Sequence, residues 1–391
     1  MQLREQPVAQ RTQPRTGGIP MGTPDTGRLT APELDASLVD WLDANATSLD
    51  TRAALKAEVV PRLAAAGLFR IGVPAGLGGA GGTTADAIAG IAAVAEHSLT
   101  AAFVLWGQRS FIEYLLQSPN AALRARWLPA LLDGRCAGAS GLSNAMKYLC
   151  GIESLQIDAT RHADSADDWR LTGRMAWVTN LRAERFVVAA AVAFDDGRPS
   201  AIVAIPDDAR GLARSTDLDL IALRGSNTAA LHLDAVPSDA AWLIHPDAQT
   251  FLPAVRPAFL GLQCGLSIGL ARRSLAEARR AAETTRGILG PEVESCAAEL
   301  AAACAQLSAG IADGSLRLHP NRLFELRIAL ATLVATAVNL ELEASGGRGY
   351  LRDAGLGFER RWREAAFIPI VTPSVVQLKA QLAAQARSIA A

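Results

Sequence analysis

A glycine-rich motif near residue 80 is the first segment whose residue types could bind a cofactor. Residues 76–81 read Gly-Leu-Gly-Gly-Ala-Gly and match the GxGxxG pattern, in which small residues let the backbone approach a pyrophosphate. That site needs a preceding strand and a helix that opens inside the motif. The preceding segment is very short and contains Pro74. The pattern therefore favours a flexible turn between helices over a dinucleotide site.

Patterns for metal and serine-hydrolase chemistry are absent from the sequence. The 5 histidines are not at metal-ligand spacing from one another, and no HExxH pattern occurs. The GxSxG turn that carries a nucleophilic serine is also absent. We therefore expect no metal centre, and we expect the histidines to have structural or surface roles.

Three other segments combine hydroxyl and amide side chains, a tryptophan and clustered glycines. Residues 139–145 read Ala-Ser-Gly-Leu-Ser-Asn-Ala, residues 171–180 end in Trp-Val-Thr-Asn, and residues 346–350 read Gly-Gly-Arg-Gly-Tyr. Taken singly, they predict a turn, a strand and the C-terminal cap of a helix. Their order and spacing are more informative than any one of them, once the surrounding elements are placed.

Helical patterns occupy both ends of the chain and strand patterns occupy the middle. Helical spacing starts near Leu34, and residues 154–245 carry β-prone segments such as 186–194 and 201–206. From about Phe251, apolar residues recur every three or four positions, which is typical of the long helices of a bundle. The recurring positions are Val293, Cys296, Leu300, Cys304, Leu307 and Ile311, then Leu323, Leu326, Leu330, Leu333, Ala337, Leu340 and Ala344.

This order predicts an α+β fold, because a doubly wound parallel sheet would need strands that alternate with helices. We expect a disordered tail at 1–29, an N-terminal helical domain at 30–137 and a central antiparallel β-sheet or barrel domain at 138–247. A C-terminal four-helix bundle domain is expected at 248–391.

Bulk composition indicates a globular protein without a polyanionic partner. The 391 residues carry a formal net charge of -1, which favours neither nucleic acid nor an anionic membrane surface. We find no apolar signal core and no uninterrupted apolar run of membrane-spanning length. The 5 scattered cysteines lack a CxxC pair, which predicts reduced, mostly buried thiols and a cytoplasmic location.

The motifs taken together resemble the acyl-CoA dehydrogenase family, over about residues 34–387. Besides the three segments above, the resemblance rests on Val73-Pro74 before the glycines and on residues 127–134, which read Trp-Leu-Pro-Ala-Leu-Leu-Asp-Gly. It also rests on residues 222–228, which read Ala-Leu-Arg-Gly-Ser-Asn-Thr, and on residues 232–237, which read His-Leu-Asp-Ala-Val-Pro. The resemblance implies the three-part fold of that family and a flavin between the sheet and the bundle.

The resemblance also implies which residues contact the flavin ring. Backbone amides of the loop at 142–144 would face its pyrimidine edge, where fixed N–H dipoles stabilise the charge of the reduced form. Trp177 would pack against the ring, and Thr179 would lie near N5. The implied contacts are Leu142, Ser143, Asn144, Trp177, Thr179 and Asn180.

For the ADP half of FAD, the resemblance implies Arg286 and the glycines Gly346, Gly347 and Gly349. Two departures weaken this site. Glu343 stands where the family has a glutamine, which puts a negative charge near a phosphate. The arginine is followed by Gly-Ile-Leu-Gly at 287–290, a partial match only. We therefore expect FAD, with FMN as the alternative.

The largest departure concerns catalysis. The dehydrogenases remove a proton with a glutamate at the position that Thr372 occupies here, and a hydroxyl of high pKa cannot serve as that base. Some relatives place the glutamate on the first bundle helix, but residues 258–263 contain no carboxylate. By resemblance, Trp106, Gln108 and Thr372 would line the substrate pocket.

The missing base leaves three interpretations open. The first is a two-component monooxygenase that uses reduced flavin and O2 on a small organic substrate. The second is a dehydrogenase whose base comes from elsewhere, with Glu343, Asp353, Glu359 and Glu364 as candidate acids. The third is a non-catalytic paralogue. A flavin reductase or an electron-transfer flavoprotein is the expected partner, and a homotetramer or homodimer the expected assembly.

Overall fold

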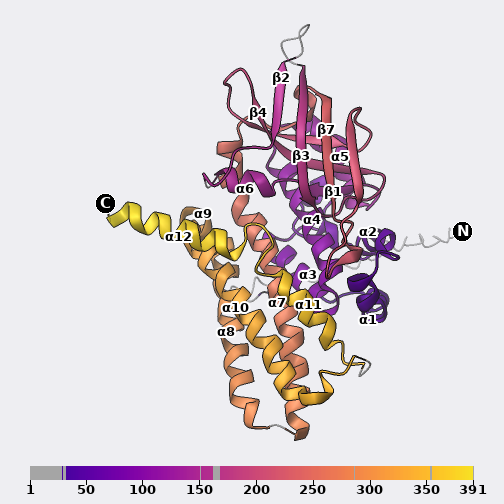
Figure 1. Cartoon of the computed structure of the whole chain (residues 1–391), viewed down its shortest axis with the longest axis vertical. Coiled ribbons are helices and arrows are strands. Elements are labelled where there is room, and N and C mark those ends of the chain that lie inside the picture. Colours follow the sequence, from indigo (N-terminus) through magenta and orange to yellow (C-terminus); the bar gives the residue numbers. More distant parts are fainter. Residues whose placement is uncertain are drawn as a thin grey trace, which may run out of the picture.

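The computed structural model folds the chain into N-terminal helices, a sheet and a long helical bundle (Figure 1). The sheet lies at one end of the molecule and the bundle extends away from it, with the N-terminal helices packed between and beside them. The structure describes residues 29, 32–149, 151–161, 168–285, 287–352 and 355–390. Most of the predicted tail at 1–29, together with Cys150, Arg286 and Asp353, lies outside the described residues.

The N-terminal block is built around a helix that is buried along most of its length. Its helices are α1 (Ala36–Thr51), α2 (Lys56–Ala65), α3 (Thr84–His97), α4 (Leu99–Gln117) and α5 (Ala121–Leu132). Side chains at the N-caps start several of them: Asp35 accepts from the amide of Leu38, and Thr83 forms a capping box with Asp86. All residues from Leu99 to Leu115 are buried. Helix α4 is therefore the core of this block.

The GxGxxG segment is a compact turn between helices, as its pattern predicts. Residues Ala75–Leu77 form a 3-10 turn, and Gly81 bridges back to Ile71 and Val73. A side chain at Gly79 would place its Cβ 1.9 Å from the carbonyl oxygen of Val73. The glycine is needed so that the chain can fold back on itself, and no strand leads into a helix here.

The central block is a mixed sheet, so the expectation of an antiparallel sheet is wrong in part. Its strands run in the order β6-β7-β3-β2-β4-β5-β8, and β1 pairs with β4. The pairs β1–β4 and β2–β4 are parallel, because the chain crosses over through α6 (Ser143–Leu149) and the β2–β3 hairpin before β4. The strands are β1 (Ala137–Ser140), β2 (Ile157–Arg161), β3 (Trp169–Val178), β4 (Phe186–Phe194), β5 (Ala201–Pro206), β6 (Leu212–Asp217), β7 (Ala229–Ser238) and β8 (Leu243–His245).

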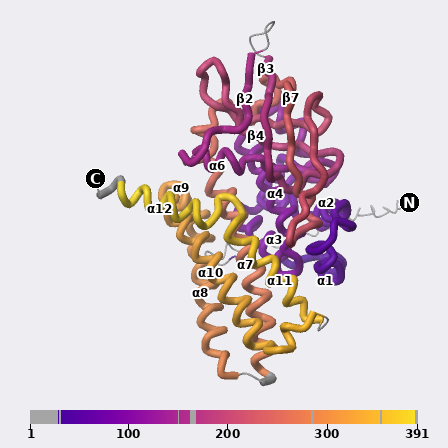
Figure 2. The backbone as a smooth tube through the Cα atoms, in the orientation of Figure 1, coloured from indigo at the N-terminus to yellow at the C-terminus, as the bar shows by residue number. Residues whose placement is uncertain are grey.

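The C-terminal block is the predicted helical bundle, and α7 (Ala248–Thr285) is its longest helix. Helix α7 packs against α3 and α4 of the first block and against α8 and α10 of its own. The other helices are α8 (Gly290–Ala312), α9 (Ser315–Leu318), α10 (Pro320–Ser345), α11 (Phe358–Phe367) and α12 (Val375–Ala390). Figure 2 shows α12 running sideways, away from the long helices.

Helices α7 and α3 approach each other closely because α7 carries glycines at every fourth position. Gly261, Gly265 and Gly269 lie on one face of α7, in a row that faces α3. A Cβ at Gly265 would lie 2.8 Å from the carbonyl oxygen of Ile88, and one at Gly269 would lie 2.1 Å from that of Ala92. This contact fixes the first bundle helix against the N-terminal block.

Among the residues that the structure describes, 3 helices are long and apolar enough to cross a membrane by length and composition alone, namely Ala248–Glu283, Gly287–Ala312 and Pro320–Arg348. Each of these segments contains charged residues, so the prediction that no uninterrupted apolar run reaches membrane-spanning length is not contradicted. In the fold these segments are the long helices of the bundle, and 83% of the most apolar part of the first is buried within the protein.

Candidate functional site

An exposed tryptophan and a row of hydroxyl groups lie at the end of β3. The side chain of Trp177 is 63% exposed, because the pairing of β3 with β7 is irregular between Met175 and Val178. Next to it, the hydroxyl of Thr179 lies 3.2 Å from that of Thr228. The exposed face of an indole ring, next to buried hydroxyl groups, suits a flat aromatic ligand.

The predicted loop at 142–144 is the start of a short helix. Leu142 is fully buried, and Ser143 begins α6. The side chain of Asn144 donates to the carbonyl of Ser154 (2.9 Å) and accepts from the amide of Gln156 (3.0 Å). Asn144 therefore holds the segment after α6, and its amide group is committed to the protein backbone.

Gln108 and Asn180 join the first block to the sheet. Gln108 donates to the carbonyls of Leu131 and Cys136 and accepts from the amide of Gly138 (2.7 Å). It also accepts from Asn180, whose amide lies 2.8 Å away, and both side chains are fully buried. The structure thus places Gln108 in a structural junction, where all its hydrogen-bonding capacity towards protein is used.

Trp106 lies in a cluster of aromatic rings between α4 and α7. Its indole stacks on Phe103 (5.4 Å between centroids) and packs at 5.1 Å against Phe259, whose carbonyl accepts its N–H. Phe367, just before the Thr372 turn, contacts Phe103 edge-on at 4.7 Å. These rings pack against one another, and Phe367 connects the cluster to the segment that precedes Thr372.

Thr372 lies in a turn that side chains from two bundle helices hold in place. Gln263 of α7 donates to the carbonyl of Thr372 (3.0 Å). Arg327 of α10 donates to the side chain of Gln263 (2.8 Å) and to the carbonyl of Ile368 (2.6 Å). Thr372 itself is half-buried. The groups that surround this turn are therefore amides, carbonyls and one guanidinium.

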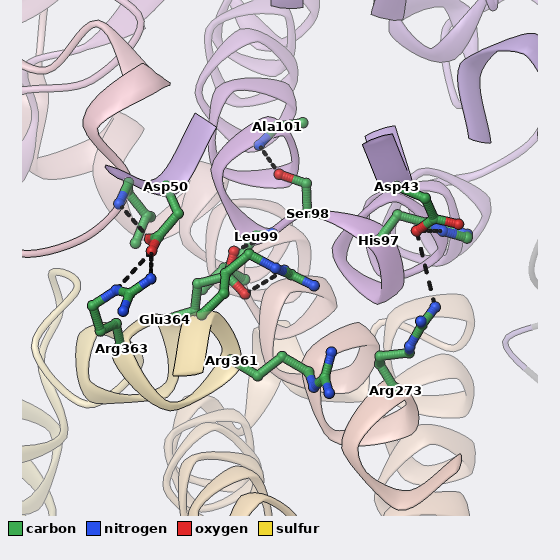
Figure 3. A network of polar contacts seen from close by, with 12 residues as sticks. Asp43, Asp50, His97, Ser98, Leu99, Ala101, Arg273, Arg361, Arg363 and Glu364 are labelled. Carbon is green, nitrogen blue, oxygen red and sulfur yellow. Dashed lines mark hydrogen bonds and ion pairs between the residues drawn. The ribbon is translucent and has the colours of Figure 1, made fainter. Parts of the chain in front are cut away.

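Glu364, the buried carboxylate nearest in sequence to this turn, serves the fold. It accepts from the amide of Leu99 at the start of α4 (3.1 Å) and pairs with Arg360 at 2.7 Å (Figure 3). Burial raises the pKa of Glu364, and the nearby Arg360 opposes that effect. Glu359 pairs with Arg363 at 2.6 Å and is likewise committed.

A second buried carboxylate, Asp50 of α1, connects all three blocks. One oxygen accepts from the side chain of Arg363 of α11 (2.8 Å), and the other accepts from the amide of Leu223, which precedes β7 (3.0 Å) (Figure 3). Asp50 is fully buried. The contact fixes α11, and with it the turn that follows, relative to the sheet.

The glycine segment after α10 does not join these residues. Figure 1 shows that the link between α10 and α11 lies at the end of the bundle away from the sheet. A Cβ at Gly349 would lie 2.8 Å from Cβ of Ser345, so this glycine permits a tight turn, whereas Gly347 has open space around it. Gly346 has a positive φ of 59°. In one chain, these glycines therefore lie at the end of the bundle away from the sheet, whose strand β3 carries Trp177.

Metal chemistry has no support among the described residues, where no cluster of three or more His, Cys, Asp or Glu side chains could hold a metal ion. A cavity of about 70 Å³ lies within the sheet block, lined mainly by apolar residues such as Trp169 and Phe194, and it includes none of the predicted site residues.

The four cysteines in the described segments are free and buried, as predicted, and they are Cys136, Cys264, Cys296 and Cys304.

Sequence reasoning missed the residues that hold the Thr372 turn. Gln263 and Arg327 are 109 and 45 positions away from it, and neither belongs to a recognisable motif. The available signal was a lone arginine at a position that the apolar spacing of α10 assigns to the core, between Leu326 and Leu330. Such a residue marks a buried polar network.

Comparison with known proteins agrees with this architecture. Residues 36–135 match the sequence model of the acyl-CoA dehydrogenase N-terminal domain. A probable acyl-CoA dehydrogenase of Bacillus subtilis, YngJ, is 27% identical over 261 residues, which cover 62% of this chain and 66% of that protein. The alignment thus spans slightly less than two thirds of the relative's length.

Solved structures with the same fold have diverse ligands. KijD3, in complex with FMN and a dTDP-sugar, superposes with a TM-score of 0.75 at 21% identity, covering 93% of this chain and 97% of that one. FkbI gives a TM-score of 0.74 at 22% identity, with 91% and 99% covered. Butyryl-CoA dehydrogenase of Megasphaera elsdenii gives 0.71 at 16% identity, with 91% and 94% covered. Residues 36–135 thus match the N-terminal domain of acyl-CoA dehydrogenases, and the chain as a whole is similar in fold to members of the acyl-CoA dehydrogenase superfamily.

Proposed function

We propose that this protein is a flavin-dependent monooxygenase, which receives reduced flavin from a separate reductase and transfers oxygen to a small organic substrate. The observation that carries the proposal is the chemistry of the Thr372 turn. The hydrogen bonds that reach this segment from the long helices come from the amide of Gln263, at Thr372, and from the guanidinium of Arg327, at Ile368. Proton abstraction from carbon needs a positioned base of suitable pKa, and none of these groups is one.

The candidate acids near the turn in sequence support the same conclusion. Glu364 is bound to Arg360 and to the amide of Leu99, and Glu359 is bound to Arg363. Moving Glu364 towards the turn would leave Arg360 and the start of α4 without their partner, which costs several kcal/mol for a buried pair. Glu364 is thus poorly suited to supply a base.

The residues at the end of β3 fit a flavin ring. The exposed indole of Trp177 offers a face, and the hydroxyl of Thr179 follows two residues later in the chain. Bound in reduced form, the flavin would supply the activation of O2. Asn144 would act by keeping α6 in place, since its side chain is bound to Ser154 and Gln156. FAD and FMN both suit this half of the site.

The aromatic cluster supports a short or compact substrate. Phe103, Trp106 and Phe259 pack against one another at centroid distances of 5.4 and 5.1 Å. A long acyl chain would have to displace these rings, and interior packing tolerates little added volume.

Exposed apolar side chains of the C-terminal block support assembly into a homotetramer or homodimer. Tyr350 is 84% exposed, Val376 is 75% exposed and Ile370 is 65% exposed. Large apolar groups gathered on one block are often covered by another subunit.

Two rapid-mixing experiments test the proposed function. The protein is loaded with FMN or FAD, reduced under argon and mixed with aerated buffer. Two resolved phases of flavin reoxidation would support oxygen activation by the bound flavin. In the second experiment the oxidised form is mixed anaerobically with butyryl-CoA or octanoyl-CoA. Bleaching of the flavin by either thioester would refute the proposal.

The second candidate function is α,β-dehydrogenation of a thioester, which the similarity to a probable acyl-CoA dehydrogenase favours. It requires a base from a segment outside the turn. Bleaching in the anaerobic experiment, followed by product with one new carbon–carbon double bond, would establish it. A protein that binds neither flavin would support the third interpretation, a non-catalytic paralogue.

A further inference from the structure

Arg327 is a buried arginine whose hydrogen bonds are incomplete. Its side chain is fully buried in the middle of α10. Nε donates to the oxygen of Gln263 (2.8 Å), and Nη2 donates to the carbonyl of Ile368 (2.6 Å). Nη1 has no acceptor among the residues that the structure describes. A buried donor without a partner is costly and calls for an explanation.

Arg327 also differs from the other buried arginines in its charge environment. Arg361 is bound to Glu341, Arg360 is bound to Glu364, and Arg109 has Glu113 at 3.7 Å. Within the described part of the chain, no carboxylate lies within 4.0 Å of Arg327. Burial lowers the pKa of Arg327, but an arginine in a protein keeps its proton. The charge is therefore uncompensated.

The guanidinium of Arg327 lies behind the link between α11 and α12, and Figure 1 shows this link at the end of the bundle nearer to the sheet. Gln263 connects the guanidinium to the carbonyl of Thr372 by a 3.0 Å hydrogen bond. Where the dehydrogenases of this fold are expected to carry a carboxylate, this chain has a neutral threonine, with a buried cation behind it. The Thr372 turn together with Gln263 and Arg327 is called here the wall of the site. The charge of this wall is thus opposite in sign to that expected for a dehydrogenase.

We propose that Arg327 is a positioning residue, which holds the Thr372 turn through Gln263 and gives this wall a positive charge that stabilises the anionic, reduced form of a bound flavin. The inference rests on the proposed function, since it requires flavin at the end of β3. Negative charge that appears in a poorly solvated site interacts strongly with a fixed cation nearby. A buried cation without a carboxylate is retained because the ligand provides the counter-charge.

The test is the midpoint potential of FMN bound to the full-length protein, measured by spectrophotometric redox titration. Arg327→Gln removes the charge and keeps a donor for Ile368. Gln263→Glu keeps the arginine but neutralises it with an adjacent carboxylate. Arg327→Lys retains the charge. The matched control is Arg322→Gln, which removes an exposed arginine from the same helix.

We expect Arg327→Gln and Gln263→Glu each to weaken binding of reduced relative to oxidised FMN by about tenfold, which lowers the potential of a two-electron couple by about 30 mV. Arg327→Lys and Arg322→Gln should leave the potential near that of the wild type. If Arg327→Gln does not fold, Gln263→Glu still tests the inference, because the introduced carboxylate pairs with Arg327 and neutralises its charge. A residue with only a packing role would give equal potentials in all variants.

Equal potentials in wild type, Arg327→Gln and Gln263→Glu would overturn the inference and leave the proposed function standing. A wild-type protein that binds neither FMN nor FAD would overturn the proposed function, and this inference with it. The two failures therefore give different results.

Discussion

A single added methyl group at Gly269 should separate α7 from α3. In an alanine variant the new Cβ would lie 2.1 Å from the carbonyl oxygen of Ala92 and 2.6 Å from Cβ of Ala95. Ordinary contact begins at 3.4 Å. The first distance is therefore about 1.3 Å too short, and the two obstacles are a backbone oxygen and a Cβ, which cannot rotate away.

The same row of glycines provides a graded series. At Gly265 the new Cβ would lie 2.8 Å from the carbonyl oxygen of Ile88, and at Gly261 it would lie 3.0 Å from the flexible end of the Ile88 side chain. We expect Gly269→Ala to lower the free energy of unfolding by about 3 kcal/mol, Gly265→Ala by about 1–2 kcal/mol, and Gly261→Ala by less than about 1 kcal/mol. Urea unfolding followed by far-ultraviolet circular dichroism measures each value.

Gly290→Ala is the matched control for this series. A Cβ there meets nothing within 4 Å, and the position starts α8. Alanine is favoured over glycine inside a helix by about 1 kcal/mol, so the control should be neutral or slightly stabilised. If Gly269→Ala is as stable as Gly290→Ala, or if the order within the series is reversed, the close contact between the two helices is not as described.

Three further outcomes follow from the site. Trp177→Ala should weaken FMN binding by about tenfold and leave thermal unfolding of the flavin-free protein unchanged, since the side chain is 63% exposed; an unchanged dissociation constant would separate Trp177 from the flavin. Gln108→Ala should lower the urea-unfolding free energy by about 2–4 kcal/mol, because it loses four hydrogen bonds that join α4 to α5 and the sheet; a loss below about 1 kcal/mol contradicts that role. The raised pKa of Glu364 means that its carboxyl group binds a proton more tightly in the folded than in the unfolded protein. The protonated carboxyl therefore adds to the free energy of unfolding. This addition is complete below the unfolded pKa and is lost as pH rises through the folded pKa. The free energy of unfolding of the wild type should therefore fall as pH rises above the ordinary pKa of about 4.5, relative to Glu364→Gln, and equal slopes would argue against the shift.

Local periodicity was sufficient to predict most elements. The seam at Leu323, Leu326 and Leu330 is buried in α10, and residues 186–194 form β4. These predictions succeed because each element shows its buried face through spacing within a few residues. The parallel pairing of β1 and β2 with β4 was not predictable in this way, because parallel strands are paired through crossovers that leave no local spacing.

The site was predictable in its motifs and not in its partners. The resemblance implied that Trp177 packs against a flavin, and the structure exposes its side chain at the end of β3. The resemblance also implied that Gln108 lines the substrate pocket. Its actual partners include Asn180, 72 positions later, and contacts across such a separation depend on packing that one sequence does not reveal.

The carboxylate of Asp50 has a consequence for attempts to dissect the protein. It is fully buried, and its partners Arg363 and Leu223 belong to the bundle and the sheet. A fragment that ends after α5 would retain this acid without either partner, and α4 would begin without the oxygen of Glu364 on the amide of Leu99. We therefore expect such a fragment to be much less stable than the same helices in the full-length protein.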